Sequence, residues 1–221
     1  MSLETLTLNP TGPTTGAVVW LHGLGASCTD FVSLLPWVKR PGVRFVFPQA
    51  PDRPVSINGG AVMPAWYDIT TLSESSDRED LDDVAVSATA LTSILDDLRA
   101  EGIASERITL VGFSQGAAMS LWVGHRYPHR LKAILVMSGY LLAPDRHAAE
   151  GHAANAATPT FHMHGTRDEV VPVHRGEAAY RVMDDGRPTR WETYRMRHEL
   201  CRDQAGDLKA WFEDAYAGPI L

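Results

Sequence analysis

The segment Gly112-Phe113-Ser114-Gln115-Gly116 decides how the whole chain is interpreted. It comes directly after the apolar run Ile108–Val111 and directly before residues with helical spacing that stop at Pro128. A serine between two glycines, at the turn from a strand into a helix, matches the G-x-S-x-G pattern of a nucleophilic serine. The glycines are required because the turn is so sharp that side chains at their positions would collide. The pentapeptide also occurs by chance, but the flanking strand and helix favour a nucleophile at Ser114.

Strands and helices alternate on both sides of this segment. Short apolar runs predict strands at residues 17–21, 43–47, 108–111, 133–137, 160–163 and 191–196. Helical spacing predicts helices at 29–38, from the capping box Ser76-Asp77-Arg78-Glu79 to Gly102, and at 115–127, 174–184 and 205–216. Residues 48–66 are rich in Pro and Gly and are expected to form a long loop, while 140–158 stay unassigned. The alternation predicts an α/β fold with a mostly parallel central sheet and helices on both faces. Without a linker or repeat, it predicts one domain over residues 1–221.

The composition is that of a soluble globular protein and excludes several classes. Of the 221 residues, 44% are apolar, and 27 acidic against 20 basic side chains give a net charge of −7. That charge disfavours a nucleic-acid partner or an anionic membrane surface. No apolar run approaches the roughly 20 residues of a membrane span, and no signal-peptide pattern opens the chain. We therefore expect a cytoplasmic protein without membrane insertion.

A serine hydroxyl needs a base to take its proton, and the chain offers one in the expected order of serine, acid, histidine. Of the eight histidines after Ser114, His198 is the one that lies in the loop just after the last predicted strand, where the base is expected. The carboxylate that orients this base should follow the preceding strand, where Asp168 stands. Asp184, Asp185 and Glu169 are weaker candidates. The order predicts that Ser114, Asp168 and His198 meet at the carboxyl edge of the sheet.

A metal site and a disulfide are both disfavoured. His162, His164 and Asp168 could suggest metal ligands, but the pair of histidines has no clear third and fourth partner. We expect neither a metal nor another cofactor. Cys28 and Cys201 are expected to be structural, with a regulatory disulfide left as an alternative.

With these residues assembled, nearly the whole chain resembles the carboxylesterase / acyl-protein thioesterase family of α/β-hydrolases. The segments that carry the resemblance are Leu21-His22-Gly23-Leu24-Gly25, Pro48-Gln49-Ala50-Pro51, Asn58-Gly59-Gly60, Ala65-Trp66-Tyr67-Asp68-Ile69, the Ser114 pentapeptide, His164-Gly165-Thr166-Arg167-Asp168, Val170-Val171-Pro172 and the strand before His198. The resemblance implies an α/β-hydrolase fold, with Ser114 as nucleophile, His198 as base and Asp168 as its orienting group. It also implies an oxyanion hole formed by the backbone N–H groups of Leu24 and Gln115. His22 would then shape the loop that contains Leu24.

Three positions depart from the family pattern. Ala117 stands where a second glycine is usual, and Ala26 stands where an aspartate is common. The base lies in Arg197-His198-Glu199 instead of a setting like Gly-His-Ser, which leaves open how its loop is held.

These observations together predict a serine hydrolase that cleaves carboxylic esters of small to medium acyl chains through an acyl-enzyme. An acyl-protein thioesterase or lysophospholipase is the first alternative, because the triad chemistry suits thioesters and oxyesters equally. An acyltransferase and a non-catalytic binding module on the same fold remain further alternatives. Trp66, Ile69, Leu72 and Val170 are expected to contact the substrate, although apolar residues of the 48–73 loop could equally pack against the core. The partner is then a small-molecule ester or thioester, and the protein is a monomer or a homodimer.

Overall fold

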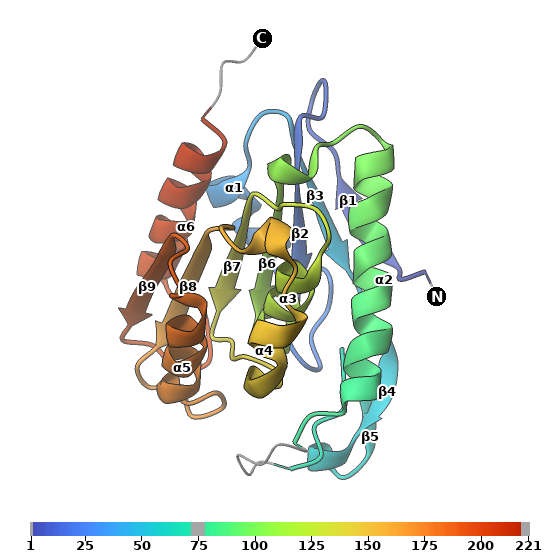
Figure 1. Ribbon diagram of the computed structural model, residues 1–221, viewed down its shortest axis with the longest axis vertical. Helices are drawn as coiled ribbons and strands as arrows, with labels where there is room; N and C mark the ends of the chain where they lie inside the picture. Colours follow the sequence, from blue (N-terminus) through green and yellow to red (C-terminus); the bar gives the residue numbers. More distant parts are fainter. Residues whose placement is uncertain (1, 72–77, 218–221) are drawn as a thin grey trace.

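The computed structural model describes residues 2–71 and 78–217, which form a seven-stranded sheet between two layers of helices (Figure 1). The strand order is β1 (Thr5–Leu8), β3 (Val43–Pro48), β2 (Gly16–Leu21), β6 (Ile108–Phe113), β7 (Ala133–Met137), β8 (Thr160–Gly165) and β9 (Thr189–Tyr194). All neighbours pair in parallel except β1, which runs antiparallel to β3 at the edge. The predicted α/β fold with a mostly parallel sheet is confirmed.

Two apolar cores lie on opposite faces of the sheet, because alternate residues of each strand point to opposite sides. Ala17, Val19 and Leu21 of β2 face the core under α2 (Leu81–Ala100), α3 (Gln115–Arg126) and α5 (Val173–Met183). Val18 and Trp20 face the core under α1 (Leu35–Val38) and α6 (Arg202–Ala215). The apolar runs of the central strands are continuous for this reason: both of their faces are covered.

The predicted loop at residues 48–66 is wrong. Strands β4 (Asp52–Val55) and β5 (Ala61–Pro64) form an antiparallel hairpin there, joined by a turn in which Gly59 and Gly60 have positive φ. Pro54 and Pro64 concealed these strands, because proline is rare in sheets. A two-stranded hairpin tolerates proline, since each strand has a free edge on which the missing N–H is not needed.

Helix α2 begins at a different cap from the predicted one. The carboxylate of Asp80 accepts hydrogen bonds from the N–H groups of Asp82 and Asp83, at 2.9 and 3.0 Å, and thereby caps the helix. Ser76 and Asp77 of the predicted capping box lie outside the described residues.

The other differences are local. The helix expected at 29–38 is reduced to a 3-10 turn at Val32–Leu34 and the four-residue α1, because Pro36 can only stand in the first turn of a helix. The unassigned segment 140–158 contains the short helix α4 (Pro144–Glu150). None of the helices in the described ranges has the length and apolar character needed to span a bilayer.

Candidate active site

Ser114 lies at the sharp turn between β6 and α3, in a backbone conformation that side chains rarely adopt. Its φ is 55° and its ψ is −122°. Its N–H donates a hydrogen bond of 2.9 Å to the carbonyl of Met137, at the end of the neighbouring strand β7. The residue is 8% exposed. The sheet therefore holds the serine in a strained, largely buried position at its carboxyl edge.

The two glycines of the pentapeptide have the steric role expected from the sequence. A Cβ on Gly112 would lie 2.3 Å from the carbonyl oxygen of Gly116. A Cβ on Gly116 would lie 2.5 Å from the carbonyl oxygens of Leu21 and His22. Both distances are impossible for real atoms, so the turn and the close approach of α3 to β2 require glycine at both positions.

Ser114, His198 and Asp168 are joined by two short hydrogen bonds. The Nε2 atom of His198 lies 2.8 Å from the Oγ atom of Ser114. The Nδ1 atom of His198 lies 2.7 Å from the Oδ2 atom of Asp168. Because a carboxylate only accepts, Nδ1 carries the proton and Nε2 is left as an acceptor for the serine hydroxyl. The three residues come from the ends of β6, β8 and β9, as the order along the chain predicted.

The loop after β8 holds Asp168 in its ionised form. Its Oδ1 atom accepts hydrogen bonds from the N–H groups of Val170 and Val171, at 2.9 and 2.8 Å. Burial would raise the pKa of this carboxyl, but the hydrogen bonds from His198, Val171 and Val170 outweigh burial and lower the pKa below its ordinary value. Sequence reasoning missed these two donors. The pattern Asp168-x-Val170-Val171 was the available signal, because aspartate commonly accepts from N–H groups two and three residues on.

The loops that carry Asp168 and His198 are bonded to each other. The N–H groups of Thr166 and Arg167 donate to the carbonyls of Tyr194 and Met196, at 2.8 and 3.0 Å. This answers the question raised by the unusual neighbours of His198. Its loop is held by the backbone of the Asp168 loop, and the ring packs 4.8 Å, centroid to centroid, from the ring of Phe113.

Leu24 and Gln115, the expected oxyanion donors, flank Ser114. A Cβ on Gly23 would lie 3.3 Å from the Cβ of Ser114, so the loop containing Leu24 runs beside the serine. Gln115 is the first residue of α3, where helical N–H groups have no partner within the helix and carry partial positive charge. In the described part of the chain, no oxygen accepts a hydrogen bond from the Leu24 or Gln115 N–H.

The structure does not place the four expected substrate contacts on one surface. Trp66 is fully buried and Ile69 is 6% exposed, and both belong to the core under α2 and α3. Val170 is 60% exposed next to Asp168, and Leu72 lies outside the described residues. Trp66 is therefore corrected to a core residue, because its amide and indole N–H groups are both used inside the protein.

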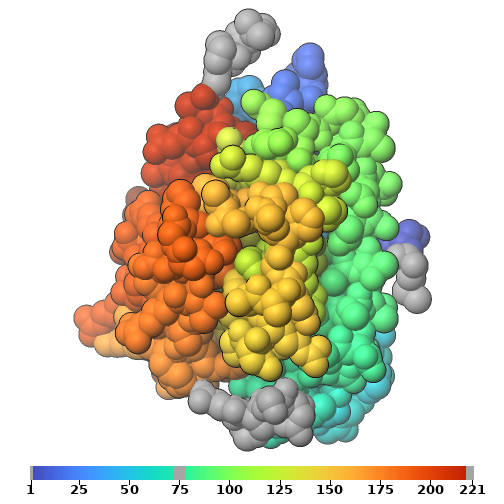
Figure 2. Space-filling model, viewed as in Figure 1, coloured from blue at the N-terminus to red at the C-terminus, as the bar shows by residue number. Residues whose placement is uncertain are grey.

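A cavity of about 400 Å³ lies between α4 and α5 at the carboxyl edge of the sheet. Its lining consists of the largely apolar residues Tyr140, Leu141, Ala143, Pro144, Ala178, Ala179 and Val182 and the ionisable residues Glu79, Asp145, His174 and Arg175. The two helices lie side by side on the face seen in Figure 2.

Metal ligands are not grouped anywhere in the described ranges, where no three His, Cys, Asp or Glu side chains come close enough to hold an ion. The Nε2 atom of His164 lies 2.8 Å from the carbonyl oxygen of Val171, so this histidine bonds to the Asp168 loop. Cys28 and Cys201 are free thiols.

Known proteins match the chain over nearly its whole length. The profile of the phospholipase/carboxylesterase family matches residues 4–214. Acyl-protein thioesterase 1 of Yarrowia lipolytica is 31% identical over 214 residues, covering 90% of this chain and 92% of the relative. The crystal structure of esterase PE8 superposes with a TM-score of 0.85 and 30% identity, covering 97% and 100% of the two chains. Acyl-protein thioesterase 2 of Zea mays gives 0.83 and 26%, covering 96% and 98%.

Proposed function

Because the chain belongs to the phospholipase/carboxylesterase family of α/β-hydrolases, we propose that it is a serine hydrolase that cleaves acyl esters and thioesters at Ser114. The observation that carries the proposal is the imidazole of His198, which bridges the Ser114 hydroxyl and the Asp168 carboxylate at 2.8 and 2.7 Å. A serine becomes a nucleophile at neutral pH when such a base takes its proton.

The proposed reaction has two steps with balanced proton transfers. The Ser114 oxygen attacks the acyl carbon while its proton passes to Nε2 of His198, and Asp168 stabilises the imidazolium that forms. The N–H groups of Leu24 and Gln115 bind the negative oxygen of the tetrahedral intermediate. His198 then gives its proton to the leaving alcohol or thiol, and the acyl-enzyme remains. A water molecule repeats the sequence, releases the acid and restores Ser114.

Thioesters are the substrate class that the relatives favour. Relatives from three organisms carry the name acyl-protein thioesterase 1. The prediction from sequence alone was different: an oxyester of a small to medium acyl chain. The likeness to esterase PE8 keeps the oxyester as the second candidate. The cavity between α4 and α5 is our candidate for the acyl-binding region, because apolar residues form the larger part of its lining. The ionisable Glu79, Asp145, His174 and Arg175 line the rest, and none of Ser114, Asp168 and His198 lines it.

Matched substrates test this proposal. We would measure kcat/KM for S-acyl and O-acyl compounds with the same acyl chain, over chains of two to sixteen carbons, with Ser114→Ala as the control. The proposal predicts turnover that Ser114→Ala abolishes and a preference for the thioester at each chain length. Full activity in Ser114→Ala would contradict the proposed nucleophile. A preference for the oxyester would leave the nucleophile in place and favour the second candidate.

A further inference from the structure

Trp66 bonds to both loops that supply the proposed oxyanion donors. Its backbone N–H donates a hydrogen bond of 2.8 Å to Oε1 of Gln115. Its indole Nε1–H donates a hydrogen bond of 2.8 Å to the carbonyl oxygen of His22. The side chain is fully buried, so neither bond competes with water. One residue therefore links the start of α3 to the loop after β2.

His22 transmits this link to the N–H group of Leu24. Its Nε2 atom accepts a hydrogen bond of 3.0 Å from the Ala50 N–H, which puts the ring proton on Nδ1. Nδ1 lies 2.8 Å from the carbonyl oxygen of Gly23 and donates to it. That carbonyl and the Leu24 N–H belong to one trans peptide unit, so they point in opposite directions. The imidazole thus fixes where the Leu24 N–H points and strengthens it as a donor by polarising the peptide.

His22 keeps this arrangement because it stays neutral. The ring is 1% exposed, and burial lowers its pKa below the ordinary value despite opposing contributions from Gly23 and Asp30. The His22 ring also packs against the Trp66 ring, with 5.3 Å between the centroids, so Trp66 contacts His22 through its ring as well as through the indole N–H.

The side chain of Gln115, whose backbone N–H is the second proposed donor, is also fixed by hydrogen bonds. Its Oε1 accepts from the Trp66 N–H, and its Nε2 donates to the carbonyl of Tyr67 at 2.7 Å. Both ends of a buried side chain are therefore fixed by two successive residues. Because the backbone N–H of the same residue is the proposed second donor, the bonds that fix the side chain also fix the first turn of α3.

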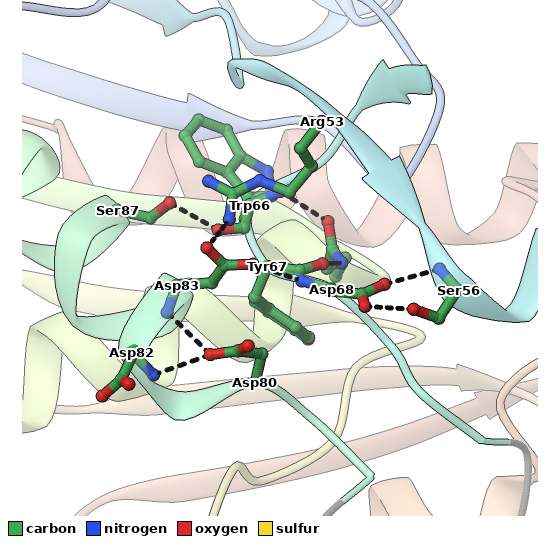
Figure 3. Close-up of polar contacts among 10 residues, drawn as sticks. Arg53, Ser56, Trp66, Tyr67, Asp68, Asp80, Asp82, Asp83 and Ser87 are labelled. Atoms are coloured by element: carbon green, nitrogen blue, oxygen red, sulfur yellow. Dashed lines mark hydrogen bonds and ion pairs between the residues drawn. The ribbon is translucent and has the colours of Figure 1, made fainter. Parts of the chain in front are cut away.

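The segment around Trp66 is itself anchored to α2 and to Ser56, which follows β4 (Figure 3). The Ser87 hydroxyl of α2 donates to the Trp66 carbonyl. The Asp68 N–H donates to Asp83 at the start of α2, and the Asp68 carboxylate accepts from the N–H and hydroxyl of Ser56, beyond β4. Trp66 is thus held between α2, the β4–β5 hairpin and the two donor loops.

We propose that Trp66 is a positioning residue that couples the two halves of the oxyanion hole. The inference rests on the proposed function and adds a residue to it. Trp66 is fully buried, and within the described residues its two N–H groups donate hydrogen bonds to Gln115 and His22 and not to Ser114. It acts through the His22 carbonyl on one side and the Gln115 amide on the other, and so keeps both donors aimed at one point.

The test is Trp66→Phe, which keeps an aromatic ring and removes the indole N–H. The matched control is Trp20→Phe, because Trp20 is 1% exposed in β2, the strand before the Leu24 loop, and its Nε1 has no hydrogen-bond partner in the described structure. Each variant is compared with wild type in kcat, in KM, and in affinity for a trifluoromethyl ketone and for the corresponding alcohol. The ketone forms an oxyanion on the serine, and the alcohol does not.

The expected result for Trp66→Phe is a kcat lower by about 10-fold with KM unchanged. This is less than the 10²–10³ for loss of a whole donor, because the donors are only misdirected. Affinity for the ketone should fall by the same factor as kcat/KM, while affinity for the alcohol is unchanged. Trp20→Phe should match wild type in all four quantities. A purely structural role for Trp66 would weaken both inhibitors equally or neither.

Three results would overturn the inference. One is a folded Trp66→Phe enzyme whose kcat and ketone affinity stay within twofold of Trp20→Phe. If Trp66→Phe fails to fold, Gln115→Met is used instead, because it removes the hydrogen bonds of the Gln115 amide to Trp66 and Tyr67. Unchanged affinity of Gln115→Met for the ketone is the second result. The third is a folded wild type that neither turns over esters or thioesters nor binds the ketone, which would remove the proposed function as well. Turnover by wild type with an unaffected Trp66→Phe removes this inference alone.

Discussion

The backbone of Ser114 is the most informative feature at the scale of single residues. With φ of 55° and ψ of −122°, it occupies a region that is costly for any residue with a Cβ, by about 1–3 kcal/mol. Such strain persists only where surrounding contacts fix it, and here the Met137 carbonyl and the close approach of α3 to β2 do so.

This strain predicts that two inactive variants of Ser114 differ in stability. Ser114→Gly should unfold at a higher urea concentration than Ser114→Ala, with a free energy of unfolding greater by about 1 kcal/mol, because glycine relieves the strain and alanine keeps it. Both variants lack the hydroxyl and should be inactive. Equal stability of the two variants would show that the turn is not strained at this residue.

Asp168 gives a second prediction at the residue scale. Because its Oδ1 accepts two backbone N–H groups, Asp168→Asn must keep its amide oxygen there and turn its NH₂ group toward His198. Nδ1 would then have to accept, which places the ring proton on Nε2 and removes the acceptor for the serine. The expected loss in kcat is roughly 10⁴-fold, measured at saturating substrate near pH 7.5. A loss of less than tenfold would contradict the orienting role of Asp168.

At the scale of elements, the unit of β6, turn and α3 has no room for a side chain at either of its two glycines. Gly116→Ala places a Cβ 2.5 Å from two carbonyl oxygens of the β2 end, and backbone cannot move aside as a side chain can. We expect a loss of about 3 kcal/mol in the free energy of unfolding, with displacement of the oxyanion loop and loss of activity.

Gly206→Ala in α6 is the matched control for that substitution. A Cβ at Gly206 meets nothing within 4 Å, so alanine should stabilise the helix by about 0.5–1 kcal/mol. Both free energies come from urea denaturation followed by circular dichroism. A Gly116→Ala protein as stable as wild type would contradict the steric account of the pentapeptide.

The elements that could be predicted from sequence are those whose pattern and environment agree. Strand Ala133–Met137 is an uninterrupted apolar run because both its faces are covered, so its bounds were predicted without error. The hairpin β4–β5 could not be predicted, because its strands contain Pro54 and Pro64 and depend on pairing with each other. Strand β1 was missed because it is a short edge strand that alternates between exposed and partly exposed residues.

At the scale of the whole molecule, buried neutral histidines couple stability to pH. His162 is 1% exposed beside Tyr180 and Trp191, and burial, with a smaller contribution from His164, lowers its pKa to about 3. In the unfolded chain the pKa is about 6.5. Between these values the unfolded chain binds a proton that the folded chain does not, so stability present above pH 6.5 is lost as the pH falls. His147 acts in the same direction, because burial lowers its pKa to about 4.

His162→Phe tests this coupling. Phenylalanine suits the aromatic surroundings and takes up no proton on unfolding, so the variant should lose less stability than wild type between pH 8 and pH 5. The measurement is the midpoint of thermal unfolding at the two pH values. An equal or larger drop in the variant would show that His162 is not responsible for acid sensitivity.

The site could be predicted from sequence only where chemistry and chain order constrained it. That Ser114, Asp168 and His198 meet could be predicted because each follows a strand, and parallel strands bring their carboxyl ends to one edge. The positions of Trp66 and Ile69 could not be predicted, because an apolar residue in a loop can line a groove or pack inward equally well. Their burial depends on the cover that α2 and α3 provide, which no local pattern records.

An activated serine is the central claim, and labelling with a fluorophosphonate probe tests it most directly. The purified protein and its His198→Ala variant would be treated with the probe, and the modified residue would be identified by peptide mass spectrometry. The account predicts one adduct, on Ser114, that is lost in His198→Ala. An unlabelled wild-type protein, or equal labelling of Ser114 in the variant, would contradict it.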